Sequence, residues 1–465
     1  MDRRYALGLS LIAAFLLIVL LDARHLGYLD TGDSNNLVQG ARVVLHCLRR
    51  AEFVGCGHLS GSIHTLVFPY PLLQYLPAGF LVGLGMSDRQ VLVALGVVSF
   101  VAFATAILAV ALTFRDRPRS GALVLLALIG SSLVYQSTSA FGEALAASLV
   151  VLAVCAGIRR RPLAIFSLVF AASLGKETLA PFVVVLVLVC ARSDRGVLPD
   201  RRVTSAAMAG AFSAIVLAAT FNVFRFGSIK NLLYLDSPLH TPGIVRKFDF
   251  FLAISGSPSA GVFWFWPFFS ALALAGTGLG IRRLIRRPDM PNGYLPVLTV
   301  TGVMLLWFAG LSAWFSPFGW VAYGPRLEVP LLAGLAVAYG HTIGDAIARV
   351  AQTHRGARLA GLAIVLAGSL QLLAPWRYAA VIHQFSVGRG TCPPLGQLDV
   401  YRDPSQYYRC TDQFIWRLRP SVFDDLVDVG VSWAAAGWFT GSIALVLLWR
   451  FIGAADPLTQ GRAPA

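Results

Sequence analysis

Residues 5–21 read YALGLSLIAAFLLIVLL and follow the short charged start Met1-Asp2-Arg3-Arg4. This uncharged run is longer than the hydrophobic region of a typical secretory signal peptide, and no small-residue cleavage site follows it. It is long enough to cross a bilayer as a helix, and the arginines before it favour a cytoplasmic N-terminus. We therefore predict an uncleaved first membrane span over residues 6–22.

The rest of the chain has the same apolar character. Hydrophobic residues make up 57% of the 465 residues and charged residues 13%. Soluble domains contain about a quarter charged residues, so this composition predicts a polytopic membrane protein. The net charge of +15 comes from 38 Lys and Arg against 23 Asp and Glu. The basic residues gather in short loops between apolar runs, which is the positive-inside pattern, and this argues against nucleic-acid binding.

Apolar stretches of spanning length recur along the chain, about twelve in all. The stretch 66–86 is interrupted by Pro69, Pro71 and Pro77, and we interpret it as a half-inserted juxtamembrane helix. The predicted fold is an all-α polytopic membrane protein, a single domain over residues 1–465 with both termini in the cytoplasm. The expected spans are 6–22, 89–114, 121–137, 140–158, 162–175, 178–192, 203–223, 262–281, 295–315, 327–347, 358–375 and 433–451.

The long loops all fall on the predicted outer side. They are 23–64, which with the juxtamembrane helix forms an external segment 23–87, and the loops 224–261 and 376–432. Cytoplasmic loops of about a dozen residues leave no room for a folded domain. No glycine-rich nucleotide-binding motif or Walker motif follows a strand. Any active site is therefore expected at the outer face of the plasma membrane or within the membrane.

The strongest catalytic candidates are two acids just beyond the first span, in Leu29-Asp30-Thr31-Gly32-Asp33-Ser34. One carboxylate can act as a general base on an acceptor hydroxyl, and the second can orient the acceptor or a cation. We favour Asp33 as the base and Asp30 as its neighbour. The alternative is helix capping by Asp33, ahead of an interfacial helix that starts near Ser34. Capping would explain one acid but not both.

Further charges lie at the predicted outer ends of spans. Glu143 begins one span, and Lys176-Glu177 separates two others. A charge is costly at the centre of a bilayer, so charges near the interface are tolerated but still unusual. In the functional interpretation, Lys176 faces a phosphate, and Glu143 or Glu177 holds sugar or acceptor hydroxyls. In the alternative they form ion pairs or helix-start carboxylates.

Two basic regions are candidates for phosphate binding. Arg326 follows Tyr323 at the start of a span, where a guanidinium and a helix N-terminus both favour a phosphate. An arginine reaching to the interface is the alternative. The second outer loop carries Lys230, Arg246 and Lys247, which can attract a lipid phosphate. The nearby Phe263-Trp264-Phe265-Trp266-Pro267 is typical of an interfacial aromatic belt.

The cysteines divide by location. Cys155 and Cys190 fall in apolar runs and are expected to be small core residues. Two pairs lie in predicted external segments, where an oxidising compartment favours disulfides Cys47–Cys56 and Cys392–Cys410. The spacing of His46, His58 and His64 matches no familiar metal-ligand pattern. We therefore predict no metal site from them.

Four local patterns resemble the GT-C superfamily of integral-membrane glycosyltransferases. They are the acidic Thr31-Gly32-Asp33, the proline-rich 68–75 (FPYPLLQY), Asn222 to Ser228 with the later Phe265-Trp266-Pro267, and Tyr323-Gly324-Pro325-Arg326-Leu327 with Pro330. Their order, with the topology, covers most of the chain. The adjacent acidic doublet of some branches is absent here, where the two acids are three residues apart.

The resemblance implies transfer of a sugar from a polyprenyl phosphate to a cell-envelope glycan or lipid. Asp33 would match the family's catalytic acid, and Arg326 a basic residue near the donor phosphate. The amino-acid usage suggests a GC-rich bacterium, in which mannose or arabinofuranose would be the natural sugar. A divalent cation is compatible with this chemistry, and no other cofactor is implied. The alternatives are a transporter or flippase of a lipid-linked sugar and a non-catalytic scaffold, although no pair of interrupted helices suggests the inverted repeats of transporters.

Overall fold

The regular elements of the described part of the chain are all helices, as the sequence predicts. The computed structural model describes residues 2–22, 32–56, 72–140, 142–192, 200–229, 242–288, 290, 293–314, 326–376, 392, 404–416 and 433–454. The side chains of residues 32–36, 404, 414 and 433 are outside this description.

Twelve helices correspond in position to the expected spans. Eight helices of the described residues are long and apolar enough to cross a membrane. Four shorter ones, α5, α7, α8 and α9, overlap the remaining expected spans, so the count of twelve crossings stays a prediction. The twelve are α1 (Arg3–Leu21), α4 (Asp88–Thr113), α5 (Pro118–Ile129), α7 (Gly142–Ile158), α8 (Pro162–Gly175), α9 (Ala180–Cys190), α10 (Arg201–Phe226), α14 (Pro267–Arg286), α15 (Leu295–Ser312), α16 (Val329–Thr353), α17 (Arg355–Gln371) and α20 (Trp433–Ile452).

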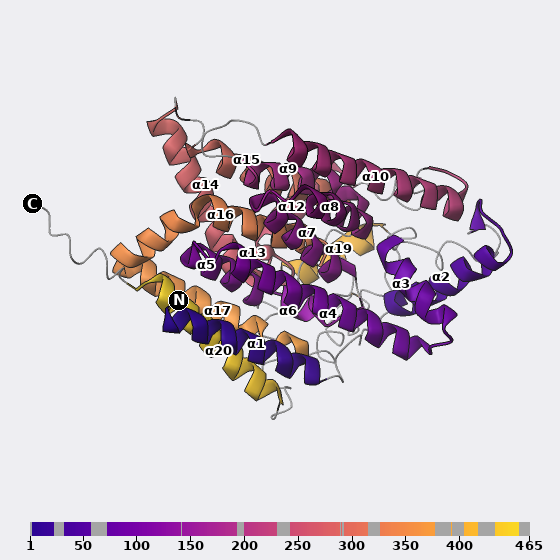
Figure 1. The fold of residues 1–465 in the computed structure, drawn as a ribbon, viewed down its shortest axis with the longest axis horizontal. Helices are drawn as coiled ribbons and strands as arrows, with labels where there is room; N and C mark the ends of the chain where they lie inside the picture. The colour runs from indigo at the N-terminus through magenta and orange to yellow at the C-terminus, as the bar shows by residue number, and fades with distance from the viewer. Residues whose placement is uncertain are drawn as a thin grey trace, which may run out of the picture.

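The first and last helices lie side by side (Figure 1). The ring of Tyr5 in α1 packs 5.1 Å from that of Phe451 in α20. The start of the first helix therefore meets the end of the last one. This arrangement requires an even number of membrane crossings and agrees with termini on one side of the membrane.

One predicted span is divided in the structure. The sequence analysis expected a continuous helix over 121–137, but α5 ends at Ile129 and a short helix α6 covers Leu133–Ser137. The backbone N–H of Ser132 donates to the Phe265 carbonyl at 3.0 Å, and the Trp266 indole donates to the Ser132 hydroxyl at 3.0 Å. These bonds to another segment replace the helical bonding, which explains the break.

The long segments that are predicted to be external contain helices of their own. The first holds α2 (Gly32–Arg49) and α3 (Leu72–Gly83), the second α12 (Ile244–Gly256), and the third α19 (Pro404–Ile415), while the short helix α13 (Val262–Phe265) directly follows the second segment. The second segment was expected to begin at 224, but α10 continues to Phe226. At a rise of 1.5 Å per residue, α3 is about 18 Å long, which is shorter than the hydrocarbon core of a bilayer. This length fits the predicted half-inserted helix.

Apolar contacts hold α2 and α3 together as a unit at the end of the molecule opposite the start of α1 (Figure 1). Leu37, Val38 and Ala41 of α2 are buried in one cluster with Tyr75 of α3. The same cluster includes Phe221 of α10. The external helices are therefore fixed to the bundle by burial of apolar surface.

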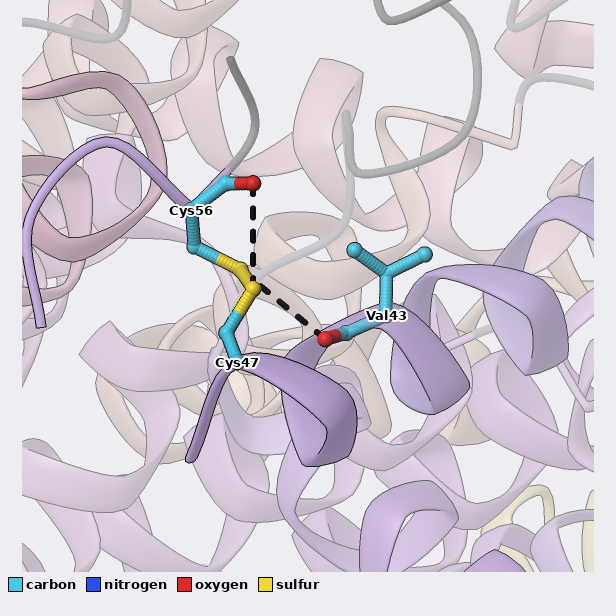
Figure 2. The surroundings of a disulfide bond; sticks show 3 residues. All are labelled: Val43, Cys47 and Cys56. Atoms are coloured by element: carbon cyan, nitrogen blue, oxygen red, sulfur yellow. Dashed lines mark hydrogen bonds between the residues drawn. A yellow bond between two sulfur atoms is a disulfide. The ribbon is translucent and has the colours of Figure 1, made fainter. Parts of the chain in front are cut away.

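Both predicted cysteine pairs are disulfides in the structure, and Cys155 and Cys190 are free and buried. Figure 2 shows Cys47 near the end of α2, bonded to Cys56 and one helical turn from Val43. The backbone N–H of Gly55 also donates to the Val223 carbonyl of α10 at 3.2 Å. The disulfide thus closes a turn that is attached to the bundle.

Removing this disulfide is expected to destabilise the protein by about 2–4 kcal/mol, because the bond restricts the unfolded chain. The test compares the thermal unfolding of Cys47→Ser/Cys56→Ser with that of wild type in the same detergent. Cys392–Cys410 stays intact in this variant and serves as the control for oxidative folding. An unchanged unfolding midpoint would contradict the prediction.

Candidate functional site

Four charged residues from distant parts of the sequence meet at the ends of three neighbouring helices. Glu143 lies in the first turn of α7, and Lys176 directly follows α8. Arg326 and Glu328 form the turn that precedes α16. The structure thus brings together three residues that the sequence singled out, Glu143, Lys176 and Arg326. It adds a fourth, Glu328, that was not predicted.

The contacts within this charged cluster are specific. The Arg326 Nε lies 3.4 Å from the Glu143 Oε1, and these two side chains are 8% and 14% exposed. The Lys176 Nζ donates to the Leu327 carbonyl at 3.0 Å. The same ammonium lies 5.3 Å from the centre of the Trp307 ring of α15, which is within cation–π range. Each cation of the cluster is therefore held at a defined position.

Glu328 is the least expected member of the cluster. It is 0% exposed, and neither carboxylate oxygen forms a hydrogen bond with another described residue. A carboxylate buried without hydrogen bonds is costly, so a purely structural role would leave this residue unexplained. One signal in the sequence could have indicated it. It is one of few acids in the chain, and it stands at the entry to an apolar run.

Burial shifts the pKa values of Lys176 and Glu328. It lowers the pKa of Lys176 from its ordinary value, and the carboxylates of Glu143 and Glu328 partly oppose that shift. It raises the pKa of Glu328, against the attraction of Lys176 and Arg326. Both shifts favour the neutral forms, which is the expected effect of desolvation. Perturbed pairs of this kind are typical of functional sites.

A glycine allows α3 to approach the cluster closely. A Cβ atom at Gly142 would lie 1.7 Å from the Nε2 of Gln74, so no other residue fits here without displacing that amide. Gln74 is 6% exposed, and its Oε1 has no hydrogen-bond partner among the described residues. The first external segment therefore places a buried amide against the residue that precedes Glu143.

One other basic residue of the predicted outer segments, Arg246, is engaged in ion pairs. Arg246 of α12 pairs with Asp412 of α19 and lies 3.1 Å from the Asp249 carboxylate. Its guanidinium also lies 5.1 Å from the centre of the Tyr408 ring. Arg246 therefore ties α12 to α19, and the attraction of a lipid phosphate to this loop stays a prediction.

The remaining predicted site residues are not placed in the cluster. Asp30, Lys230 and Tyr323 lie outside the described residues. Asp33 lies in the first turn of α2, because that helix begins at Gly32, and its side chain is not described. Glu177 is half-buried and makes no ion pair with another described residue. No group of three or more potential metal ligands occurs within the described ranges.

The burial of Glu328 predicts that the stability of the folded protein depends on pH. Its pKa is higher in the folded chain than in the unfolded chain, so the folded state binds more protons above pH 4.5. Wild type should therefore lose stability as the pH rises from about 4.5 towards neutrality, by roughly 1 kcal/mol or more. Glu328→Gln should show a flatter dependence. The measurement is the unfolding midpoint of both proteins across this pH range.

Glu177→Gln is the matched control, since it removes a nearby carboxylate outside the cluster. Its pH profile should follow that of wild type. Parallel profiles for wild type and Glu328→Gln would show that Glu328 does not titrate in this range.

No protein-family model matches this chain, and no curated protein matches its sequence at a significant level. Among solved structures, the chain is similar to the crystal structure of ArnT from Cupriavidus metallidurans in the apo state. The sequence identity is 15% and the TM-score 0.43, and the similarity covers 96% of this chain and 77% of that chain.

Proposed function

We propose that this chain is a membrane glycosyltransferase of the GT-C type. It transfers a sugar, with mannose or arabinofuranose favoured, from a polyprenyl-phosphate donor to a glycan or lipid acceptor of the cell envelope. The reaction takes place at the outer face of the plasma membrane. The observation that carries the proposal is the charged cluster, in which Lys176 and Arg326 lie beside two carboxylates at one end of the helix bundle.

The chemistry follows from these residue types. The bond between the sugar C1 and the phosphate oxygen breaks while the acceptor oxygen bonds to C1, which inverts the anomeric centre. Asp33 accepts the proton of the acceptor hydroxyl, with Asp30 as its neighbour. Negative charge develops on the departing phosphate, where fixed cations give their largest benefit. Lys176 and Arg326 supply that stabilisation.

Three further roles complete the proposed site. Lys230 adds a cation for the donor phosphate. Glu143, Glu177 and Tyr323 hold hydroxyls of the sugar or the acceptor. The proposal needs no cytoplasmic nucleotide domain, because the polyprenyl phosphate already activates the sugar.

The test is a transfer assay with the purified protein in liposomes. Radiolabelled polyprenyl-phosphate mannose and arabinofuranose are supplied with a panel of envelope acceptors, with Mg²⁺ or with a chelator. Labelled product supports the proposal, and the chelator arm shows whether a divalent cation takes part. Movement of the labelled lipid across the liposome, without product, would indicate a flippase. If neither sugar transfer nor lipid movement occurs with any donor, the result favours the scaffold interpretation.

A further inference from the structure

A cavity of about 410 Å³ lies far from the charged cluster on the same helices. Its lining includes the last residue of α7, Ile158, the last residue of α9, Cys190, and His341 of α16. His341 is thirteen residues beyond Glu328, which corresponds to about 20 Å along α16. The cavity therefore belongs to the end of the bundle that the arginine-rich loops predict to face the cytoplasm.

Four arginines from different connections line this cavity. They are Arg117 before α5, Arg160 between α7 and α8, Arg192 after α9, and Arg283 near the end of α14. No described residue of the lining is acidic. Positive-inside arginines usually project separately into water or headgroups. Here residues far apart in the sequence converge on one hollow.

Backbone carbonyls orient two of these guanidinium groups. Arg160 donates from Nε to the Ala191 carbonyl at 3.1 Å and from Nη2 to the Arg192 carbonyl at 3.2 Å. Its own backbone has φ +50°, in the left-handed region that non-glycine residues seldom adopt. Arg283 donates from Nη1 to the Gly293 carbonyl at 2.8 Å. Each guanidinium has five N–H donors, so both retain donors beyond these bonds.

One described carboxylate, that of Asp345, lies at the edge of this cavity. The Arg117 Nε lies 4.0 Å from the Asp345 Oδ2, and both side chains are about half exposed. Asp345 also accepts a hydrogen bond from the Ser120 hydroxyl at 2.7 Å. An exposed pair at that distance is weak. The cavity is therefore a positively charged site of a size that accepts a small ligand.

We infer that this arginine cavity binds a phosphate-bearing ligand at the face opposite the proposed transferase site. Planar guanidinium groups suit phosphate oxygens, with which they form paired, charge-assisted hydrogen bonds. The phosphate can belong to the headgroup of an anionic membrane lipid or to a soluble phosphate. Basic hollows between membrane helices on the cytoplasmic side suit the former. This inference does not depend on the proposed function.

The test measures ligand-induced stabilisation of the purified full chain in a neutral detergent. Dioctanoyl phosphatidylglycerol, dioctanoyl phosphatidylcholine and inorganic pyrophosphate are titrated separately at constant ionic strength. A bound ligand raises the unfolding midpoint by mass action. A shift with phosphatidylglycerol alone supports a lipid headgroup, and a shift with pyrophosphate alone supports a soluble phosphate.

Matched variants locate the binding. Arg117→Gln/Arg283→Gln removes two cavity arginines and should weaken binding by about tenfold for each arginine. Arg115→Gln/Arg282→Gln removes two exposed arginines, each one or two residues away and outside the lining, and should bind like wild type. If the double cavity variant fails to fold, Arg117→Gln is compared with Arg115→Gln. Equal binding by the cavity variant and the control variant would overturn the inference. So would the absence of a shift when wild type is titrated with phosphatidylglycerol and with pyrophosphate.

Discussion

Asp33→Asn is expected to lower the rate of sugar transfer by about 10²–10⁴-fold, because an amide cannot take the proton of the acceptor hydroxyl. Asparagine has nearly the same shape as aspartate and is tolerated at the start of a helix, so α2 should form normally. Transfer rates at saturating donor and acceptor provide the measurement. The thermal unfolding midpoint of the same preparation should match that of wild type.

The position of α2 supports this expectation. Asp33 lies in the first turn of a helix that packs on α3, and Gln74 of α3 contacts Gly142 next to Glu143. Helix α2 therefore packs on a helix that reaches the charged cluster through Gln74. Asp200→Asn, at the N-cap of α10 on the predicted cytoplasmic side, is the control and should leave transfer unchanged. Normal transfer by Asp33→Asn would remove Asp33 as the base and leave only a structural role in the first turn of α2.

The membrane helices could be predicted because each is specified by a local property, a long uncharged apolar run between charged flanks. An apolar run between charged flanks does not predict the break in the helix after Gly130. That break depends on the hydrogen bond that the Ser132 N–H donates to Phe265 and the one that Ser132 accepts from the Trp266 indole, and both partners lie more than a hundred residues away. A local pattern carries no information on such bonds.

The cluster was predictable only in part for a similar reason. Glu143, Lys176 and Arg326 were conspicuous as charges next to apolar runs, but the sequence did not indicate that they meet. Glu328 was missed because its significance lies in complete burial without hydrogen-bond partners, which is a property of the packed structure. The helices α12 and α19 were missed because mixed apolar and charged segments resemble loops. Their pairing depends on Arg246 and Asp412.

The second large effect concerns the lysine of the cluster. Lys176→Met is expected to reduce transfer by about 10²–10³-fold, the usual consequence of removing one preorganised group that stabilises developing charge. Arg326, which is already paired with Glu143, would remain as the single described cation beside the departing phosphate. Methionine keeps the length of the side chain and can still pack against Trp307. The loss should therefore appear in the rate of transfer.

A purely structural role for Lys176 predicts the opposite pattern. The ammonium would then serve to hold the Leu327 carbonyl, and its loss would lower the unfolding midpoint while the folded fraction retained a normal rate. Arg202→Met, in the first turn of α10 on the predicted cytoplasmic side, controls for the loss of a cation and should leave transfer near the wild-type rate. Lys176→Arg restores the charge and should recover part of the activity. A normal rate per folded molecule for Lys176→Met would exclude this lysine from phosphate stabilisation, because the charge would then be absent without consequence for the reaction.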